Sequence, residues 1–355
     1  MKRELIRWGI LGCGDVTERK SGPALQKASG SQLAAVMRRD ARNAEDYARR
    51  HGVPYWTNDA DKLINRSDVD IVYIATPPGS HLELALKVCA AGKPCYVEKP
   101  MARSAMESIA MEETFQRAGL PLFVAFYRRG FDRFKMAKEF LGNGRLGTLT
   151  SIAYTYDSPR QSYLSTAQLP WRLRAADAGA GLFYDLGSHL LDIFDFLFGP
   201  LQNVSGAAAN LASDYDVEDT VAMSFTAMSV PAVARWNFAA FENRDEIEIQ
   251  GTQGKLTLSC IGNEPIRLET SAGAQEFPCE PPLHVHQPLV QTIVDELHGL
   301  AKCPSTAATA LRTMKVMDTV LEGYYGGRNN EFWKRADTWP GKRPAPAPAQ
   351  PSKSP

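Results

Sequence analysis

Residues 7–17 read Arg-Trp-Gly-Ile-Leu-Gly-Cys-Gly-Asp-Val-Thr, a short apolar run that leads into a turn with two glycines. The run Trp8–Leu11 predicts a buried β-strand. The turn has the spacing of a dinucleotide fingerprint, in which the first two glycines let the backbone turn sharply and approach a pyrophosphate. Thr17 stands where a third glycine is usual, and that position concerns the packing of the next helix on the strand. The predicted cofactor-binding residues of this turn are Gly12, Cys13, Gly14, Asp15 and Val16.

Short apolar runs alternate with helical patterns from residue 7 to about residue 124, which is typical of βαβ units around a parallel sheet. Further strands are predicted at Leu33–Met37, Ile71–Ala75, Cys95–Val97 and Leu122–Ala125. Helices are predicted at Asn43–His51, His81–Ala91 and Ser104–Ala118, and each ends at a glycine. Gly22-Pro23 predicts a late start of the first regular helix, because proline suits a first helical turn. We therefore predict a Rossmann domain over residues 1–124.

Two arginines, Arg38 and Arg39, end the second predicted strand. An acid at this point would bind the ribose 2′-hydroxyl of NAD, whereas guanidinium groups suit the 2′-phosphate of NADP. Asp40 is the competing acid, but its position fits the N-cap of the next helix better. The sequence favours NADP as the cofactor and leaves NAD possible.

Two more motifs follow predicted strands of this domain. Thr76-Pro77-Pro78-Gly79-Ser80-His81 follows the strand at Ile71–Ala75, and Glu98-Lys99-Pro100 follows the one at Cys95–Val97. Ligands bind at the carboxyl ends of parallel strands in open α/β sheets. The predicted cofactor-side residues are therefore Thr76, Pro77, His81, Glu98 and Lys99.

The segment Gly-Ala-Gly-Leu-Phe-Tyr-Asp-Leu-Gly-Ser-His-Leu-Leu-Asp at 179–192 carries the candidate chemistry. At about 100° per residue, Asp185, His189 and Asp192 fall in one narrow stripe of a helix. Four apolar residues anchor this helix in a core: Leu182, Leu186, Leu190 and Phe194. A histidine held beside a carboxylate at such a border is a candidate proton donor or acceptor near neutral pH.

Two other interpretations of this stripe stay open. His189 could be a core histidine that bonds to a helical neighbour. A metal site would need further ligands, and no second cluster of His, Asp or Glu with ligand spacing lies nearby, so we expect no metal.

The composition limits the class of protein. The chain has 355 residues, which suggests two domains. Lysine plus arginine and aspartate plus glutamate number 40 each, so no net field favours nucleic acid or an anionic membrane, and a small-molecule partner is expected. Charges break up the apolar run at the start, which argues against a signal peptide, and no membrane span is predicted. Six cysteines without paired spacing fit a reducing, cytoplasmic compartment, with Cys13 expected to be the most exposed.

The second half of the chain has the pattern of strands with one buried and one solvent-exposed face. Alternating runs lie at Asp219–Thr226, Ala232–Phe238, Glu246–Gln250 and Lys255–Ser259. They predict an open, mainly antiparallel sheet in a C-terminal α/β domain over residues 125–335. Helices are expected at Pro288–Gly299, preceded by His284 and His286 as surface caps, and at Thr306–Tyr325 with an apolar core stripe. Residues 336–355 end in a Pro/Ala-rich stretch and are expected to form a disordered tail.

Taken in order, these motifs resemble the glucose-fructose oxidoreductase, inositol dehydrogenase and MocA family. They are the glycine turn, Thr-Pro-Pro-x-x-x-His, Ala-Gly-Lys-Pro followed by Glu-Lys-Pro, and Gly-x-Gly-x-x-x-Asp-x-Gly-x-His-x-x-Asp. The resemblance covers residues 7 to about 330. It implies a Rossmann domain, a second domain and a homo-oligomer, either a dimer or a tetramer.

The resemblance also implies roles for individual residues. Lys99 would reach the reacting hydroxyl or carbonyl, with Pro100 in a cis peptide. His189 would be the acid/base and Asp185 an orienting and substrate-binding carboxylate. Leu-Pro-Trp-Arg at 169–172 is similar to a loop that contacts the nicotinamide end of the cofactor, which implicates Trp171 and Arg172. Tyr127 departs from the family pattern, in which Asn or His often precedes the arginine pair.

The expected function is NADP(H)-dependent hydride transfer to or from a hydroxyl or ketone carbon of a sugar, polyol or similar cyclic substrate. One alternative is an NAD-dependent glycoside hydrolase of the same fold, without net redox change. The other is a non-catalytic NAD(P)-sensing regulator. Whether Lys99 or His189 donates the proton stays open at this stage.

Overall fold

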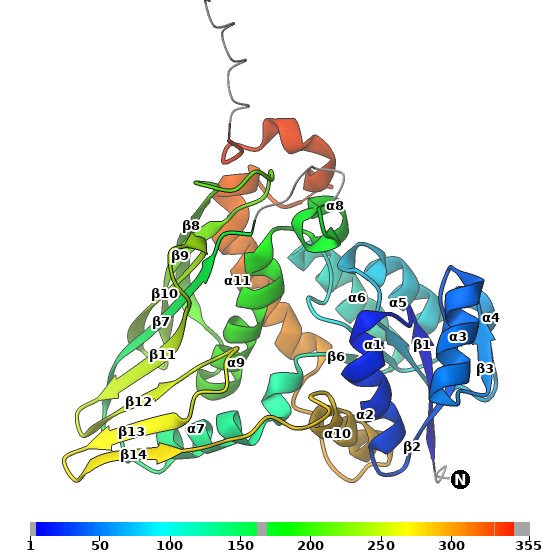
Figure 1. Cartoon of the computed structure of the whole chain (residues 1–355), viewed down its shortest axis with the longest axis horizontal. Coiled ribbons are helices and arrows are strands. Elements are labelled where there is room, and N and C mark those ends of the chain that lie inside the picture. Colours follow the sequence, from blue (N-terminus) through cyan, green and yellow to red (C-terminus); the bar gives the residue numbers. More distant parts are fainter. Residues whose placement is uncertain (1–4, 162–168, 330, 344–355) are drawn as a thin grey trace, which may run out of the picture.

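A computed structural model describes residues 5–161, 169–329 and 331–343 as two joined lobes (Figure 1). The first lobe is built on a six-stranded parallel sheet with the order β3-β2-β1-β4-β5-β6. Its strands are β1 (Ile6–Leu11), β2 (Ser31–Met37), β3 (Tyr55–Thr57), β4 (Ile71–Ile74), β5 (Cys95–Val97) and β6 (Leu122–Val124). The strand order reverses between β1 and β4, which is where ligands bind in a doubly wound sheet.

Helices cover this first sheet. They are α1 (Asp15–Arg19), α2 (Ser21–Lys27), α3 (Ala41–His51), α4 (Ala60–Ile64), α5 (His81–Ala90) and α6 (Ala105–Ala118). The strands and helices predicted for the first lobe are confirmed, apart from the residue at which the first helix begins. The late start holds for α2, which begins at Ser21 with Pro23 in its first turn, but a short helix, α1, already begins at Asp15.

The second lobe contains an eight-stranded sheet with the order β14-β13-β12-β11-β7-β10-β9-β8. Its strands are β7 (Leu149–Pro159), β8 (Gln202–Ala209), β9 (Thr220–Ala227), β10 (Val230–Ala240), β11 (Arg244–Gly251), β12 (Gly254–Leu258), β13 (Ile266–Thr270) and β14 (Gly273–Phe277). Only β7 and β10 pair in parallel, so the expectation of an open, mainly antiparallel sheet is confirmed.

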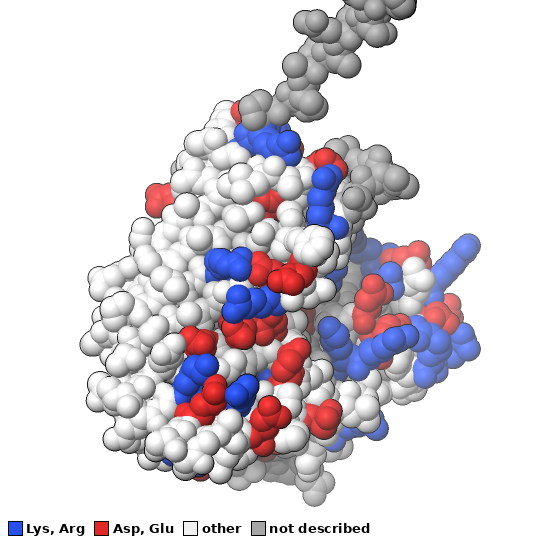
Figure 2. Space-filling model, turned by 60° about the vertical axis from the view of Figure 1, so that its left-hand side comes forward, with Lys and Arg blue, Asp and Glu red and all other residues white. Residues whose placement is uncertain are grey.

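The two faces of this second sheet differ. Alternate residues of β10 are buried and exposed, and the buried set includes Trp236, which packs against Phe183 with ring centroids 4.7 Å apart. The helices α9 (Ser188–Phe198) and α11 (Ala307–Tyr325) lie between the sheet and the first lobe (Figure 1). The outer face comes forward in Figure 2, where large areas carry no charged side chain. Val233 on β10 is 56% exposed there.

The C-terminal part of the chain returns to the first lobe. The helix α10 (Gln287–Leu297) contacts α2. Thr306 forms an isolated β-bridge to Phe123 of β6. Ser305 Oγ donates to the carbonyl oxygen of Val124 at 2.7 Å. These contacts fix the two lobes to each other, with α7 (Asp132–Gly142) leading from one into the other.

The end of the described chain packs on the second lobe. After the 3₁₀-helix η6 (Phe332–Thr338), Trp339 is buried and its ring stacks edge-on against Tyr325 with centroids 4.6 Å apart. A disordered tail that begins at residue 336 is therefore placed too early. The Pro/Ala-rich residues 344–355 lie outside the described residues.

All six cysteines are free thiols. The expectation that Cys13 is exposed is wrong, because this side chain is fully buried and burial raises the pKa of its thiol to about 11. Within the described ranges, no helix combines the length and apolar character that a membrane crossing requires.

Candidate active site

The glycine turn after β1 has the shape that a dinucleotide phosphate needs. Gly12 has φ +91°, and a Cβ there would lie 2.7 Å from Cγ2 of Thr76, so glycine lets the two neighbouring turns approach. Gly14 precedes α1, and no side chain caps the helix start. A Cβ on Gly14 would meet only the Gly12 oxygen, at 3.9 Å, so the space in front of the backbone is open. The turn thus fits a pyrophosphate through backbone N–H groups of Asp15 and Val16.

The two arginines after β2 lie beside this turn. Both are exposed, and Nη1 of Arg38 donates to the carbonyl oxygen of Cys13 at 3.3 Å. The Oδ1 of Asp40 accepts from the backbone N–H of Asn43 at 3.1 Å, which confirms Asp40 as the N-cap of α3. The carboxylate of Asp40 therefore already serves as a helix cap, whereas the guanidinium groups of Arg38 and Arg39 are exposed to solvent.

His81 connects the loops that follow β4 and β5. It is fully buried, with Nε2 2.8 Å from the oxygen of Thr76 and Nδ1 3.2 Å from that of Met101. This geometry makes His81 a support for the cofactor side of the cleft, while Thr76 and the exposed Pro77 lie at its surface.

Lys99 and Asp185 meet across the boundary between the lobes. The Nζ of Lys99 donates to Oδ1 of Asp185 at 2.5 Å and to its backbone oxygen at 2.8 Å. The Nε of Arg172 lies 3.0 Å from Oδ2 of Asp185. Although burial alone would raise the pKa of Asp185, these two cations lower it below its ordinary value. Asp185 is thus an ionised carboxylate that fixes the direction of Lys99, and the Lys99-Pro100 peptide is cis.

The segment that carries Asp185 needs its glycines for close contacts. Gly179 has φ +92°, and a Cβ there would lie 2.5 Å from the oxygen of Arg103. A Cβ on Gly181 would lie 2.6 Å from the oxygen of Glu218, and one on Gly187 would lie 2.5 Å from the Phe183 ring. Phe183–Gly187 forms a π-helical turn, η5, before α9 begins. Turns of this kind are frequent at functional sites, and this one places Asp185 beside Lys99.

His189 lies deeper, against aromatic rings of the first turn after β6. Its ring is 4% exposed and packs edge-on to Tyr127 with centroids 5.4 Å apart. Nδ1 is buried and has no hydrogen-bond partner among the described residues. Burial, followed by the charges of Lys99, Arg128 and Lys20, holds the pKa of His189 well below its ordinary value. The ring is therefore neutral at neutral pH, and no helical neighbour satisfies it as a simple core histidine would require.

Asp192 does not join this group, so the three-residue stripe is wrong at its far end. Asp192 is buried and accepts from Nε of Arg129 at 2.9 Å, and Arg129 also pairs with Asp195 at 2.8 Å. Burial raises the pKa of Asp192 to about 6 against the opposing charge of Arg129. The physical reason is its partner, because the buried Arg129 in the turn after β6 engages both carboxylate oxygens of Asp192.

Glu98, the neighbour of Lys99 in the chain, belongs to a buried polar cluster whose other members were not predicted as site residues. Tyr73 donates a short hydrogen bond to Glu98 Oε1, and burial raises the pKa of Glu98. His286 is fully buried with Nδ1 3.1 Å from the hydroxyl of Tyr96 and Nε2 3.7 Å from Glu98. Its expected place as a surface cap is wrong, because its ring packs on Tyr127 with centroids 4.5 Å apart. Tyr127 departs from the family pattern, but nothing in the sequence pointed to its contact with His286.

The remaining predicted residues lie at the rim. Trp171 is half-buried, and the guanidinium of the more exposed Arg172 lies 4.8 Å from the centre of its ring. In the described ranges no three His, Cys, Asp or Glu side chains cluster as metal ligands. The site thus combines a phosphate-fitting turn, an oriented ammonium group and a neutral imidazole, which is a set suited to hydride-transfer chemistry at an oxygen-bearing carbon.

The comparisons with known proteins agree with this geometry. Residues 6–126 match the model for the oxidoreductase family with an NAD-binding Rossmann fold, and residues 134–257 match the GFO/IDH/MocA C-terminal domain. Oxidoreductase P35 of Formosa agariphila is 34% identical over 316 residues, which cover 88% of this chain and 97% of that protein. The chain belongs to the Gfo/Idh/MocA oxidoreductase family.

Two further relatives show the range of this oxidoreductase family. Levoglucosan dehydrogenase of Pseudarthrobacter phenanthrenivorans is 30% identical over 244 residues, covering 61% of this chain and 62% of the relative. A structure of levoglucosan dehydrogenase in complex with NADH superposes with a TM-score of 0.79 at 21% identity, over 89% of this chain and 96% of that one. A 1,5-anhydro-D-fructose reductase of Ensifer adhaerens is 25% identical, covering 78% of this chain and 82% of that protein. The fold is therefore shared, and this chain is an oxidoreductase with an NAD-binding Rossmann fold.

Proposed function

We propose that this oxidoreductase transfers a hydride between NADP(H) and a hydroxyl or carbonyl carbon of a sugar, polyol or similar cyclic substrate. The observation that carries the proposal is the Lys99–Asp185 pair, at 2.5 Å, beside the neutral ring of His189. The names of the relatives, a levoglucosan dehydrogenase and a 1,5-anhydro-D-fructose reductase, support a sugar-like substrate.

The chain's own residues divide the work at the substrate oxygen. When bound, the nicotinamide supplies or accepts the hydride. Lys99 donates a hydrogen bond to the reacting oxygen and stabilises negative charge that develops there, and Asp185 holds it in place. His189 is neutral, so it is suited to accept the hydroxyl proton during oxidation. In the reduction direction the same ring returns this proton to the oxygen, because both directions pass through one transition state, while Lys99 stabilises the developing charge.

A substrate screen tests this function. The enzyme is incubated with oxidised or reduced cofactor and a panel of cyclic polyols and ketosugars, and absorbance at the reduced nicotinamide band is followed. We expect turnover that Lys99→Met abolishes. Cleavage of glycosides without net absorbance change would instead support the hydrolase alternative, and cofactor binding without any turnover would support the regulator.

The preference for NADP over NAD is part of the proposal and has its own test. Arg38 and Arg39 are exposed beside the glycine turn and no acid competes with them. Loss of one charge-assisted phosphate contact costs about 1.5–3 kcal/mol, or roughly 10- to 100-fold in affinity. Titration of both cofactors into wild type and Arg38→Ala measures this difference, with the exposed Arg49→Ala on α3 as a matched control. Equal affinity of the wild type for both cofactors would contradict it.

We also propose a homo-oligomer, a dimer or tetramer, that forms through the outer face of the second sheet. Exposed apolar side chains on and beside this face support this: Val233 on β10 is 56% exposed, and Met228 in the turn between β9 and β10 is 61% exposed. Light scattering of wild type and Val233→Glu tests it, and a monomeric wild type would contradict it. The six free cysteines support a cytoplasmic location.

A further inference from the structure

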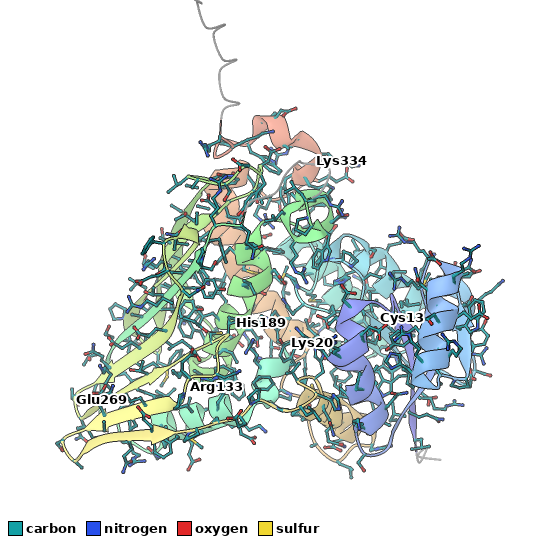
Figure 3. The ribbon with its side chains drawn as sticks, in the orientation of Figure 1. Cys13, Lys20, Arg133, His189, Glu269 and Lys334 are labelled. Carbon is teal, nitrogen blue, oxygen red and sulfur yellow. The ribbon has the colours of Figure 1, made fainter. Side chains whose placement is uncertain are left out.

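Lys20 is a basic side chain of the first lobe that faces the catalytic group of the second. It lies at the break between α1 and α2, it is exposed, and no hydrogen bond or ion pair joins its side chain to another described residue. In Figure 3 it occupies the space between α1 and His189. Its charge acts on Glu98 after β5, on His189 in α9 and on His286 before α10. Because its charge acts on side chains from three separate elements, Lys20 lies near the point where those elements meet.

The groups around this point do not balance in charge. Lys99 and Arg172 share the one carboxylate of Asp185. Arg128 is buried, donates only to the carbonyl oxygen of Cys260 at 2.8 Å, and leaves its Nε without a partner in the described chain. Lys20 therefore adds to an excess of positive charge, because burial favours the neutral form of Glu98, the acid on which its charge acts.

Unused polar atoms occur at the same place. His189 Nδ1 and His286 Nε2 are buried without a hydrogen-bond partner within the described ranges. Both rings are at least nine-tenths buried, at 4% and 0% exposure. Buried polar atoms of this kind normally have partners, and here a bound ligand would supply them.

The phosphates of the cofactor have other sites. The pyrophosphate fits the turn at Gly14, and Lys20 lies five residues beyond Asp15, about 7 Å further along the helix axis. The 2′-phosphate fits Arg38 on the far side of the glycine turn. Lys20 lies on the side of α1 that faces His189, where the substrate would react (Figure 3).

We propose that Lys20 is a substrate-binding residue, and that the substrate is a sugar that carries a carboxylate, as uronic acids do. The inference rests on the proposed function and narrows its substrate class. Lys99 and His189 act on the reacting oxygen, while Lys20 pairs with the carboxylate at another position of the ring. Such a pair is charge-assisted, and it selects acidic sugars over neutral sugars of the same stereochemistry.

Calorimetric titration of the enzyme saturated with reduced cofactor tests the proposal. The probes are three matched pairs: D-glucuronate with D-glucose, D-galacturonate with D-galactose, and D-mannuronate with D-mannose. We expect one acid to bind about 10- to 100-fold more tightly than its neutral partner, and Lys20→Gln to remove that difference. Lys27→Gln, which changes an exposed lysine on α2, leaves the difference intact. Cofactor affinity stays within about twofold in both variants.

Three results would overturn the proposal: equal binding of acid and neutral sugar, no binding of any acid, or a Lys20→Gln protein that loses cofactor affinity together with acid affinity. The hydride-transfer assay separates this failure from that of the proposed function. Lys20-dependent binding of an acid without any absorbance change would overturn the proposed function and keep the site. Turnover of neutral sugars without acid preference would overturn the role of Lys20 alone.

Discussion

Two aspartates of the same helical segment, Asp185 and Asp192, should respond in opposite ways to the same change. Asp185→Asn keeps the shape of the side chain and removes the charge that Lys99 Nζ meets at 2.5 Å and Arg172 Nε at 3.0 Å. The amide oxygen still accepts a hydrogen bond from Lys99, so one charge-assisted bond becomes a neutral one. Lys99 then samples other directions and spends less time beside the reacting oxygen.

The size of each effect follows from the contacts. Hydrogen bonds to charged groups contribute about 1.5–3 kcal/mol, so Asp185→Asn should lower kcat/KM by about 10- to 100-fold. Asp185 has 13% side-chain exposure, and Asp185→Asn leaves Lys99, at 11% exposure, with a neutral hydrogen-bond acceptor and no anionic partner, so some stability is lost as well. Asp192→Asn instead removes the main partner of the buried Arg129, at 4% exposure, which keeps only Asp195. Breaking a buried pair in this way costs about 3 kcal/mol of unfolding free energy.

The assay measures both quantities on one preparation of each variant. Steady-state kinetics per folded enzyme gives kcat/KM, and urea unfolding gives stability. We expect Asp185→Asn to lose activity with a smaller loss of stability than Asp192→Asn, and Asp192→Asn to lose stability with nearly unchanged activity. If Asp192→Asn lowered kcat/KM more than Asp185→Asn did, the assignment of the two carboxylates would be refuted.

Three further outcomes follow from burial and charge. His189→Asn should lower turnover by about two to four decades with cofactor affinity and melting temperature retained, and near-normal turnover would end its assignment as a proton acceptor. Burial raises the pKa of Glu218 from 4.5 to about 7, so the contribution of Glu218 to stability is fully present below pH 4.5 and is lost as the pH rises through 7, by at most about 3 kcal/mol. Glu218→Gln should lack this component in urea titrations at several pH values. A chain that ends at Arg343 should have the same melting temperature as the full chain. A chain that ends at Thr338 loses the buried Trp339 and about 3 kcal/mol of unfolding free energy, and equal melting temperatures of the two shortened chains would show that Trp339 adds nothing to stability.

Elements with a regular apolar pattern could be predicted from the sequence. The strands β1, β2, β4 and β5 are buried on both faces, so they read as continuous apolar runs. The alternation in β10 follows from one buried and one exposed face. β3 (Tyr-Trp-Thr) has only one buried residue of three and so shows no apolar run, and α4, with five residues, is too short to show a helical period.

The parts of the site that depend on partners far along the chain could not be predicted. Asp192 shares helical spacing with His189, but its environment is set by Arg129, 63 residues earlier. His286 is buried because Tyr96 and Tyr127 close over it from the first lobe and the turn after β6. A histidine before a helix gives no sign of such a contact. Asp185 and Lys99 could be brought together only through the family resemblance, since they lie 86 residues apart.

The buried guanidinium of Arg328 links the main chain near Asp185 to the main chain near Lys99. Arg328 Nη1 donates to the oxygen of Gly179 at 2.9 Å, and its Nη2 donates to the oxygen of Arg103 at 2.9 Å. Gly179 leads into the π turn that carries Asp185, and Arg103 follows Lys99 by four residues. The Nε of Arg328 pairs with Asp318 of α11 at 2.6 Å, so its charge is matched inside the protein. Because Arg328 fixes the backbone on either side of the ion pair, the separation of Lys99 and Asp185 depends on the C-terminal helix as well as on the two loops that carry them. The site is thus held in place from outside the cleft, and the cleft itself keeps its unpaired groups for ligands.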